Sequence, residues 1–178
     1  WCSQVLSHWA TWLPSDITGM IPSRSGYNAA YSLQTYLELA HFNHHQLAGI
    51  TLDLIKCFNN IRHECGRRLL LAIGLPATHV NCWHKSIQTM TRFWEVSGQS
   101  FGPVPATCGL PEGDSHSVLA MICIAVLWSS NIQASTSPSF KASAYADNWS
   151  WHSTEFADHE PAAKITNEVR SEEHTSEL

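Results

Sequence analysis

Residues 141–151, with the sequence KASAYADNWSW, decide the fold. Small and aromatic residues alternate up to Ala146 and again from Trp149, which is the period-two pattern of two β-strands. Between them, Asp147 and Asn148 are residue types that tolerate tight turns. The stretch therefore predicts a β-hairpin that turns at these two residues and holds a carboxylate at a rigid tip.

A second carboxylate ends another apolar run. Residues 47–53, LAGITLD, predict a strand that finishes at Asp53. Two strand-end carboxylates side by side repel each other unless a divalent cation lies between them. Hard cations such as Mg²⁺ prefer oxygen ligands of this kind. The pair Asp53 and Asp147 therefore predicts a metal-dependent phosphoryl-transfer site.

Three blocks of sequence resemble the palm domain of reverse transcriptases in their order and approximate separation. Residues 52–61 (LDLIKCFNNI) are similar to the first palm motif, 109–114 (GLPEGD) to the second and 145–148 (YADN) to the third. Residues 19–25 (GMIPSRS) are similar to the fingers segment that precedes the first motif in enzymes of non-LTR (LINE-type) retrotransposons. The resemblance covers roughly residues 15–165, and the ordered set is far more specific than any single block.

The resemblance implies an RNA-directed DNA polymerase that adds deoxynucleotides to a primer 3′-hydroxyl. Its partners would be an RNA template, a DNA primer and deoxynucleoside triphosphates. Asp53 and Asp147 would hold Mg²⁺, with Mn²⁺ as a possible substitute, and the Leu54 backbone carbonyl and more weakly Asn148 would add oxygen ligands. In two-metal chemistry one ion activates the attacking hydroxyl and the other neutralises the triphosphate.

Phe58 lies five positions after Asp53, where the family carries a bulky residue under the incoming sugar. A ring at this place clashes with a 2′-hydroxyl, so the resemblance implies a preference for deoxynucleotides. Taken alone, Phe58 would be read as an ordinary core residue. Its spacing from Asp53 favours the nucleotide-binding role.

Further candidates for nucleotide or template contact lie in two loops. Gly109 and Gly113 bracket Leu-Pro-Glu, and a glycine lets the backbone approach a ligand where a Cβ would collide. Glu112 belongs to the same loop. The turn-rich residues 15–25 would carry Arg24 toward the nucleotide, although an ordinary solvated arginine is an equal alternative.

Two positions depart from the family pattern. Glu112 stands where the family usually has Gln, which should weaken nucleotide contacts unless the acid is turned away. Asn148 stands where a second Asp is usual. The chain is therefore either a weakened but working polymerase, or a catalytically inactive or co-opted palm that binds nucleic acid or protein without chemistry. A cyclase-type palm enzyme would explain the paired carboxylates but neither the 109–114 block nor Phe58.

The fold class that these patterns predict is α+β, a reverse-transcriptase-like palm. Its antiparallel sheet would have helices packed on one face, and part of the fingers would precede it. We expect fingers in residues 1–45 and mostly palm in 46–169. The periodicities predict further elements: helices over 27–44, 63–73, 76–90, 115–131 and, weakly, 155–169, a hairpin from 92–96 and 100–104, and a surface loop over 131–139. The first of these helices should pack on the strand that ends at Asp53.

Composition bounds the remaining possibilities. A chain of 178 residues with 44% apolar content fits one globular domain, and its net charge of −5 is not that of a free-standing nucleic-acid binder. The six cysteines form no CxxC pair, which argues against zinc and favours an intracellular compartment, nucleus or cytoplasm. The longest apolar run, residues 118–128, is too short for a membrane span and predicts a buried helix.

The two ends of the chain carry separate predictions. Residues 1–12 resemble the end of a helix whose start is missing, so we expect a fragment. Residues 170–178, RSEEHTSEL, match the conceptual translation of a widely used sequencing adapter. We therefore expect natural sequence to stop near Val169, with the alternative of an authentic charged tail, and native coding sequence beyond codon 178 would exclude the adapter origin.

Overall fold

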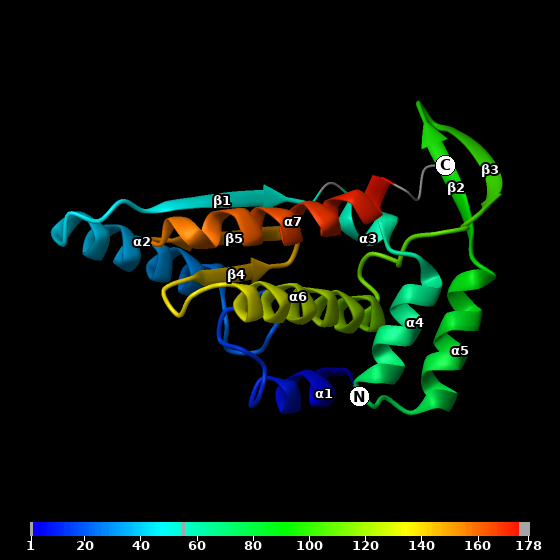
Figure 1. Cartoon of the computed structure of the whole chain (residues 1–178). Coiled ribbons are helices and arrows are strands. Elements are labelled where there is room, and N and C mark those ends of the chain that lie inside the picture. The colour runs from blue at the N-terminus through cyan, green and yellow to red at the C-terminus, as the bar shows by residue number, and fades with distance from the viewer. Residues whose placement is uncertain (1, 55, 175–178) are drawn as a thin grey trace. The chain divides into compact units, whose positions relative to one another are not determined.

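The structure is a computed structural model that describes residues 2–54 and 56–174 (Figure 1). The elements in chain order are α1 (Cys2–Trp9), α2 (Gly26–Phe42), β1 (Ala48–Asp53), α3 (Cys57–Asn60), α4 (His63–Ala72), α5 (Ala77–Gln88), β2 (Thr91–Val96), β3 (Gln99–Pro105), α6 (Ser115–Ser135), β4 (Lys141–Tyr145), β5 (Asn148–Ser153), the 3₁₀ turn η1 (Phe156–Asp158) and α7 (His159–His174). The chain divides into two compact units, residues 1–55 with 124–178, and residues 56–123. This division differs from the predicted fingers and palm segments, which stay a prediction.

The first unit is built on an antiparallel sheet with the strand order β1-β5-β4. In its register Asp53 lies opposite Asn148, and Tyr145 lies opposite Asn148 on the other side. The predicted strand at 47–53 and the predicted hairpin are both confirmed. The hairpin turns at residues 146–147, however, one residue earlier than expected.

The two faces of this sheet carry different helices. On one face the ring of Trp149 lies 4.8 Å from Trp128 of α6, and the ring of Trp151 lies 5.9 Å from His159 of α7. His152 points to the other face, where its ring lies 5.0 Å from Tyr36 of α2. The expectation of helices on a single face therefore agrees with α6 and α7 and is wrong for α2.

Helix α2 forms where the sequence predicted it. It packs on β4 and, through Tyr36, on His152 of β5, and its expected packing on the strand that ends at Asp53 stays a prediction. Ala40 is its only buried residue, whereas Leu33 and Leu37 of the predicted buried face are exposed. An apolar stripe at helical spacing is thus only partly buried in this unit.

The second unit contains the helical hairpin of α4 and α5. Leu70 and Val80 are fully buried between these helices and their neighbours, as apolar residues at helical spacing should be. Gly74 ends α4 with φ +87°, a left-handed conformation that glycine adopts without strain. The helices predicted over 63–73 and 76–90 are confirmed, each within a few residues.

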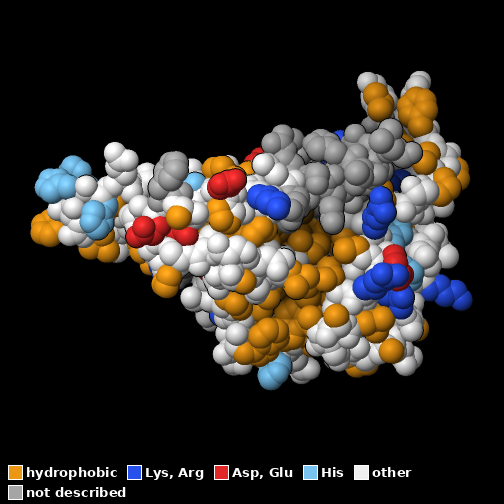
Figure 2. All heavy atoms as spheres, viewed as in Figure 1, with side chains coloured by type: hydrophobic (Ala, Val, Ile, Leu, Met, Phe, Trp, Pro, Cys, Tyr) orange, Lys and Arg blue, Asp and Glu red, His pale blue; other side chains and the backbone are white. Residues whose placement is uncertain are grey.

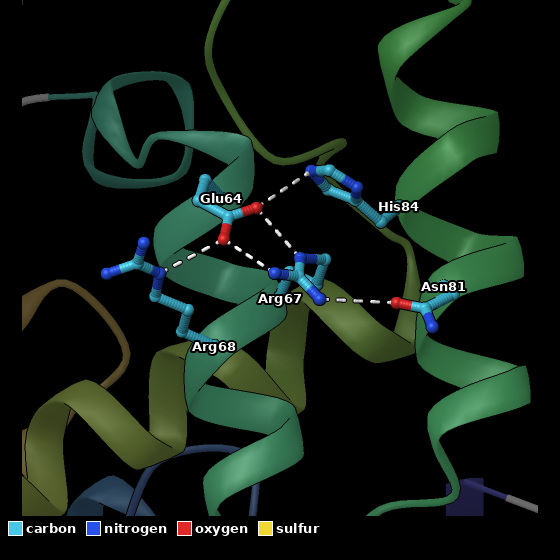
Figure 3. Close-up of polar contacts among 5 residues, drawn as sticks. All are labelled: Glu64, Arg67, Arg68, Asn81 and His84. Carbon is cyan, nitrogen blue, oxygen red and sulfur yellow. Dashed lines mark hydrogen bonds and ion pairs between the residues drawn. The ribbon is translucent and has the colours of Figure 1, made fainter.

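A polar network covers the outer side of this helical hairpin (Figure 3). The carboxylate of Glu64 accepts hydrogen bonds from Nε and Nη2 of Arg67 at 2.8 and 2.7 Å and from Nε of Arg68 at 3.0 Å. Arg67 also donates to Asn81 of α5 at 3.3 Å. Hydrogen bonds from Arg67 and then Arg68 lower the pKa of Glu64 to about 2, and burial lowers the pKa of the neighbouring His84.

The hairpin of β2 and β3 confirms the strands predicted over 92–96 and 100–104. Ser97 and Gly98 form its two-residue turn, both with positive φ (52° and 78°), as the primed hairpin turns require. The aromatic side chains of Phe93, Trp94 and Phe101 are exposed on it, and Figure 2 shows apolar groups on this part of the surface.

Helix α6 runs four residues further than the predicted end at Asn131, so the expected loop over 131–139 begins only after Ser135. By length and composition alone, this one helix of the described residues could cross a membrane. More than half of its most apolar window is buried within the structure, however, which is typical of a core helix. Leu119 and Trp128 are examples of its buried side chains. The expectation that the protein has no membrane partner stays a prediction.

Helix α7 confirms the weak helical pattern predicted after residue 155 and continues to His174. It therefore includes residues 170–174 of the segment that matches an adapter. The origin of that segment stays a prediction, and residues 175–178 lie outside the described residues.

Candidate active site

The structure brings Asp53 and Asp147 to the same end of the first unit's sheet. Asp53 is the last residue of β1 and pairs with Asn148, the first residue of β5. The next bond of this ladder runs from the Leu54 amide to the Asp147 carbonyl, at 2.9 Å. Residues far apart in the sequence are thereby fixed as neighbours by backbone hydrogen bonds. Asp53 is exposed and Asp147 is half-buried, so both are within reach of solvent.

The turn that carries Asp147 is held by a buried tryptophan. Ala146 adopts φ 52°, in the left-handed region that is uncommon for residues other than glycine. The indole Nε1 of Trp149 donates to the Ala146 carbonyl at 2.9 Å, while the Trp149 ring is fully buried. A core side chain thus closes the two-residue loop and sets where Asp147 stands.

Asn148 directly contacts the neighbouring carboxylate. Its Nδ2 donates to Oδ1 of Asp147 at 3.2 Å. An aspartate at this position would repel Asp147 in the absence of a cation, whereas the amide satisfies one of its oxygens. The amide therefore stabilises the tip without metal and competes with a metal for that oxygen.

These residues form an all-oxygen donor set. Asp53 and Asp147 offer carboxylates, and Asn148 offers an amide oxygen. Such oxygens are the ligands that Mg²⁺ and Mn²⁺ take in proteins, so the set fits a hard divalent cation. No cluster of three or more His, Cys, Asp and Glu side chains suited to a metal occurs among residues 2–54 and 56–174. A cation here would thus depend on two carboxylates and on neutral oxygens, including the predicted Leu54 carbonyl.

In the second unit, the first and second palm-like motifs are tied together by backbone bonds. The Leu110 amide donates to the Phe58 carbonyl at 2.6 Å, and the Gly109 amide donates to the Ile61 carbonyl at 3.0 Å. His63 Nε2 lies 3.0 Å from the Gly109 carbonyl. The loop that contains Glu112 and Gly113 is therefore fixed beside the short helix that presents Phe58.

Gly109 is required by this close approach. A Cβ built on it would lie 2.6 Å from the Asn59 carbonyl oxygen, and its φ is +90°. Gly113, at the other end of the loop, has φ +81° and open space where its Cβ would stand. The first glycine is thus explained by packing within the unit, and the second leaves the backbone free to approach a ligand.

The Glu112 side chain is hydrogen-bonded to Asn59. Its Oε1 accepts a hydrogen bond from Asn59 Nδ2 at 3.0 Å, at the surface of the unit. The sequence predicted weaker nucleotide contacts unless the Glu112 side chain is turned away. The hydrogen bond to Asn59 holds the Glu112 carboxylate against this amide.

Asp114 caps the start of α6. Its Oδ2 accepts from the backbone amide of Ser117 at 3.0 Å and from the Ser117 hydroxyl at the same distance. The same oxygen accepts from Trp83 Nε1 at 2.8 Å, which links the loop to α5. The second motif therefore ends in a satisfied helix cap.

Arg24 faces the backbone of its own loop, where the sequence suggested a nucleotide. Its Nη1 donates to the carbonyls of Pro14 and Ile17, the latter at 2.7 Å. Its Nη2 donates to the carbonyls of Leu13 at 2.8 Å and Ala10 at 3.1 Å. Both terminal nitrogens are occupied, so this geometry gives Arg24 a structural role and offers no support for nucleotide contact.

Sequence reasoning missed three residues that shape the site. Trp149 binds the turn before Asp147, and Asn59 binds Glu112 of the second motif, each through a side-chain hydrogen bond. Gly19 packs against the hairpin turn, where a Cβ built on it would lie 2.2 Å from the Ala146 nitrogen. Gly19 stood within the fingers-like segment, but nothing in its neighbours indicated the partner. Asn59 and Gly19 act through contacts between segments distant in the chain, whereas Trp149 binds a residue three positions earlier.

Comparisons with known proteins address the family to which the chain belongs. A search of the curated proteins finds no match for the chain. The family model for reverse transcriptase (RNA-dependent DNA polymerase) matches residues 3–175, which is nearly the whole chain and includes all three palm-like motifs. The chain belongs to the reverse transcriptase family, the RNA-dependent DNA polymerases.

Proposed function

We propose that the chain is the palm, with part of the fingers, of an RNA-directed DNA polymerase from a non-LTR (LINE-type) retrotransposon. Its reaction is the addition of deoxynucleotides to a primer 3′-hydroxyl on an RNA template, with release of pyrophosphate. Family membership supports the reaction class. The fingers-like residues 19–25 support the retrotransposon type.

The observation that carries this proposal is the pairing of Asp53 with Asn148 and of the Leu54 amide with the Asp147 carbonyl. It supports Asp53 and Asp147 as the residues that hold Mg²⁺ or Mn²⁺, with the Leu54 carbonyl and Asn148 as weaker oxygen ligands. When bound, the metal pair lowers the pKa of the attacking hydroxyl and neutralises the triphosphate. The two carboxylates orient this chemistry from a rigid sheet end.

The residues of the second unit act on the nucleotide. Phe58 excludes a 2′-hydroxyl by its bulk and so selects deoxynucleotides. Gly113 lets the loop backbone approach the base pair or template. Glu112 stays bonded to Asn59, which keeps its charge directed at an amide.

The test is primer extension on an RNA template with Mg²⁺ or Mn²⁺. We expect Asp53→Asn and Asp147→Asn each to reduce extension by more than about a hundredfold, because each removes a charged metal ligand. Glu38→Gln is the matched control, since Glu38 is an exposed carboxylate of the same unit bonded only to Gln34 in the described contacts. Equal activity in all three variants would exclude the assignment.

The second candidate function is an inactive or co-opted palm that binds nucleic acid or protein without chemistry. The hydrogen bond from Asn148 to Asp147 favours it, because that bond occupies a metal-ligand oxygen. Asn148→Asp separates the two functions. Extension by the parent chain identifies a working polymerase, and extension by Asn148→Asp alone identifies an inactive copy.

A further inference from the structure

Residues 16–19, which lead into the fingers-like segment, form an additional edge on the sheet of the first unit. Ile17 makes a parallel bridge with Ala144 of β4. The amides of Thr18 and Gly19 donate to the Ala144 carbonyl at 2.9 and 3.2 Å, and the Ala144 amide donates to the Asp16 carbonyl at 3.0 Å. The segment is therefore joined to the backbone two residues before the turn that carries Asp147.

Gly19 then brings the segment directly against that turn. A Cβ built on Gly19 would lie 2.2 Å from the Ala146 nitrogen and 2.9 Å from the Tyr145 carbonyl carbon. Both atoms belong to backbone, so no side-chain rotation relieves the clash. Only glycine fits here without moving the turn.

Arg24 holds the residues before the fingers-like segment through hydrogen bonds to their backbone. Its guanidinium binds four backbone carbonyls that would otherwise need water or other donors, those of Ala10, Leu13, Pro14 and Ile17. A planar fork of donors suits this geometry, which a lysine ammonium cannot reproduce. Ile17 is at once an acceptor for Arg24 and the residue bridged to Ala144, so the arginine acts on the strand edge through one residue.

The turn at residues 146–147 is thus held from two sides. Trp149 binds the Ala146 carbonyl from the core, and Gly19 packs against the Ala146 nitrogen from the sheet edge. The Asp147 carbonyl in turn accepts from Leu54. A shift of the residues around Gly19 therefore moves the Tyr145–Ala146 peptide, one residue before Asp147.

We propose that Gly19 and Arg24 are positioning residues for Asp147, so that the fingers-like segment sets the geometry of the metal-binding carboxylates. This proposal rests on the proposed function in taking Asp147 as a metal ligand. Neither residue touches a nucleotide in this role. Positioning of this kind typically changes metal affinity when the supporting contact is removed.

The test compares Gly19→Ala and Arg24→Lys with Gly49→Ala. Gly49 is a matched control, because a Cβ on it would lie 2.4 Å from the Trp151 carbonyl oxygen, also within this sheet. It pairs with His152, four residues along β1 from Asp53. Gly49→Ala therefore strains the same sheet at a distance from the turn.

The first readout needs no metal. It is hydrogen exchange of the Leu54 amide, measured against core amides of α6 that report global unfolding. We expect exchange at Leu54 to accelerate about tenfold or more in Gly19→Ala and Arg24→Lys, relative to those core amides. In Gly49→Ala the ratio should stay at the parent value.

The second readout is Mn²⁺ affinity, followed by electron paramagnetic resonance. We expect Gly19→Ala and Arg24→Lys to weaken binding by about ten- to a hundredfold, and Gly49→Ala to leave it unchanged. Arg24→Lys keeps the test decisive if Gly19→Ala fails to fold.

The outcomes separate the two proposals. Parent-like exchange at Leu54 in Gly19→Ala and Arg24→Lys would overturn the positioning role, whatever the metal does. A second outcome is that Leu54 loses protection in the variants but the parent chain binds no Mn²⁺. The contact between the Gly19 residues and the turn would then be confirmed, but Asp147 would not be a metal ligand. Both the positioning role and the proposed function would be overturned. Mn²⁺ binding that Asp147→Asn abolishes but Gly19→Ala and Arg24→Lys leave intact would overturn the positioning role alone.

Discussion

The two units secure their candidate functional residues in different ways. In the unit of residues 1–55 and 124–178, Asp147 stands on a turn fixed by a strand ladder and by the fully buried Trp149. In the unit of residues 56–123, the 109–113 loop is tied to α3 by backbone bonds, and its side-chain link from Asn59 to Glu112 lies at the surface. Both segments also include a fully buried side chain, Trp149 in the first unit and Leu110 in the second, so the difference lies in the strand ladder that holds Asp147.

The units also differ in charge. The first contains four Lys and Arg against eleven Asp and Glu, a net charge of −7, and the second contains six against four, a net charge of +2. Figure 2 shows basic side chains gathered around an acidic one in the region of α4. Negative potential favours a cation, and positive potential favours phosphates. This division of charge is the one that the proposed metal and nucleotide roles predict.

The largest expected effect comes from removing the packing under the first unit's turn. Trp149→Ala deletes a fully buried ring that contacts Trp128, and we expect it to lower the free energy of unfolding by about 3–5 kcal/mol. Urea unfolding followed by circular dichroism measures this. Trp149→Phe keeps most of the packing and loses the bond to Ala146, so its loss should be much smaller. Equal, small losses in both variants would show that the turn does not depend on the core.

The second prediction sharpens the contrast in charge. Asn148→Asp adds a carboxylate at the sheet end and removes the donor that binds Asp147, so we expect Mn²⁺ to bind about tenfold more tightly. Calorimetric titration measures the affinity. Asn131→Asp makes the same charge change at an exposed position of helix α6 in this unit and should leave the affinity unchanged. Equal gains in the two variants would mean a general charge effect.

The third prediction concerns the surface link of the second unit. We expect a double-mutant cycle of Asn59→Ala and Glu112→Ala to give a coupling free energy of about 0.5 kcal/mol, the low end for a hydrogen bond, because the pair is exposed. Thermal unfolding measures it. Asn59→Asp alone should lower the free energy of unfolding, because it places a second carboxylate against that of Glu112. Adding Glu112→Gln should restore the stability. Failure of this swap to recover stability would contradict a direct bond.

The smallest effect is expected in the polar network of α4 and α5. The pKa of Glu64 is lowered from 4.5 to about 2 by hydrogen bonds from Arg67 and Arg68. Its stabilising contribution is therefore complete above pH 4.5 and lost as the pH falls toward 2. Glu64→Gln should lower the midpoint of thermal unfolding slightly at pH 7, because the carboxylate is 44% exposed, and not at all at pH 2.

Glu38→Gln serves as the control for this pH series, since Glu38 is bonded to the neutral side chain of Gln34. Its difference from the parent chain should show no comparable loss between pH 4.5 and 2. A Glu64→Gln difference that persisted at pH 2 would mean that packing, and not charge, links the helices.

The sequence by itself determined the order of the elements and the pairing of two carboxylates at strand ends. Alternation of small and aromatic residues specified β4 and β5, and helical spacing specified α4, α5 and α6, because these periods follow from local backbone geometry. The same patterns, with the spacing of the motifs, indicated the reverse transcriptase family before any contact was known.

The tertiary structure alone decided where the hairpin turns. A turn at 147–148 would pair Ala144 with Trp151, whereas the observed turn at 146–147 pairs Ala144 with Trp149. Both registers place the same side chains on the same face, since they differ by two residues, so alternation cannot distinguish them. The choice agrees with the bond from Trp149 to Ala146 and with the burial of the Trp149 ring, which the rest of the unit supplies.

The roles of Arg24, Gly19 and Glu112 were likewise decided by tertiary contacts. Arg24 had been an equal choice between a solvated residue and a nucleotide ligand, and it binds carbonyls seven to fourteen residues earlier in the chain. Gly19 meets a backbone more than a hundred residues away, and Glu112 meets Asn59, which lies 53 residues earlier in the chain. Such contacts depend on which segments the core brings together, and this information is not present in local sequence periodicity.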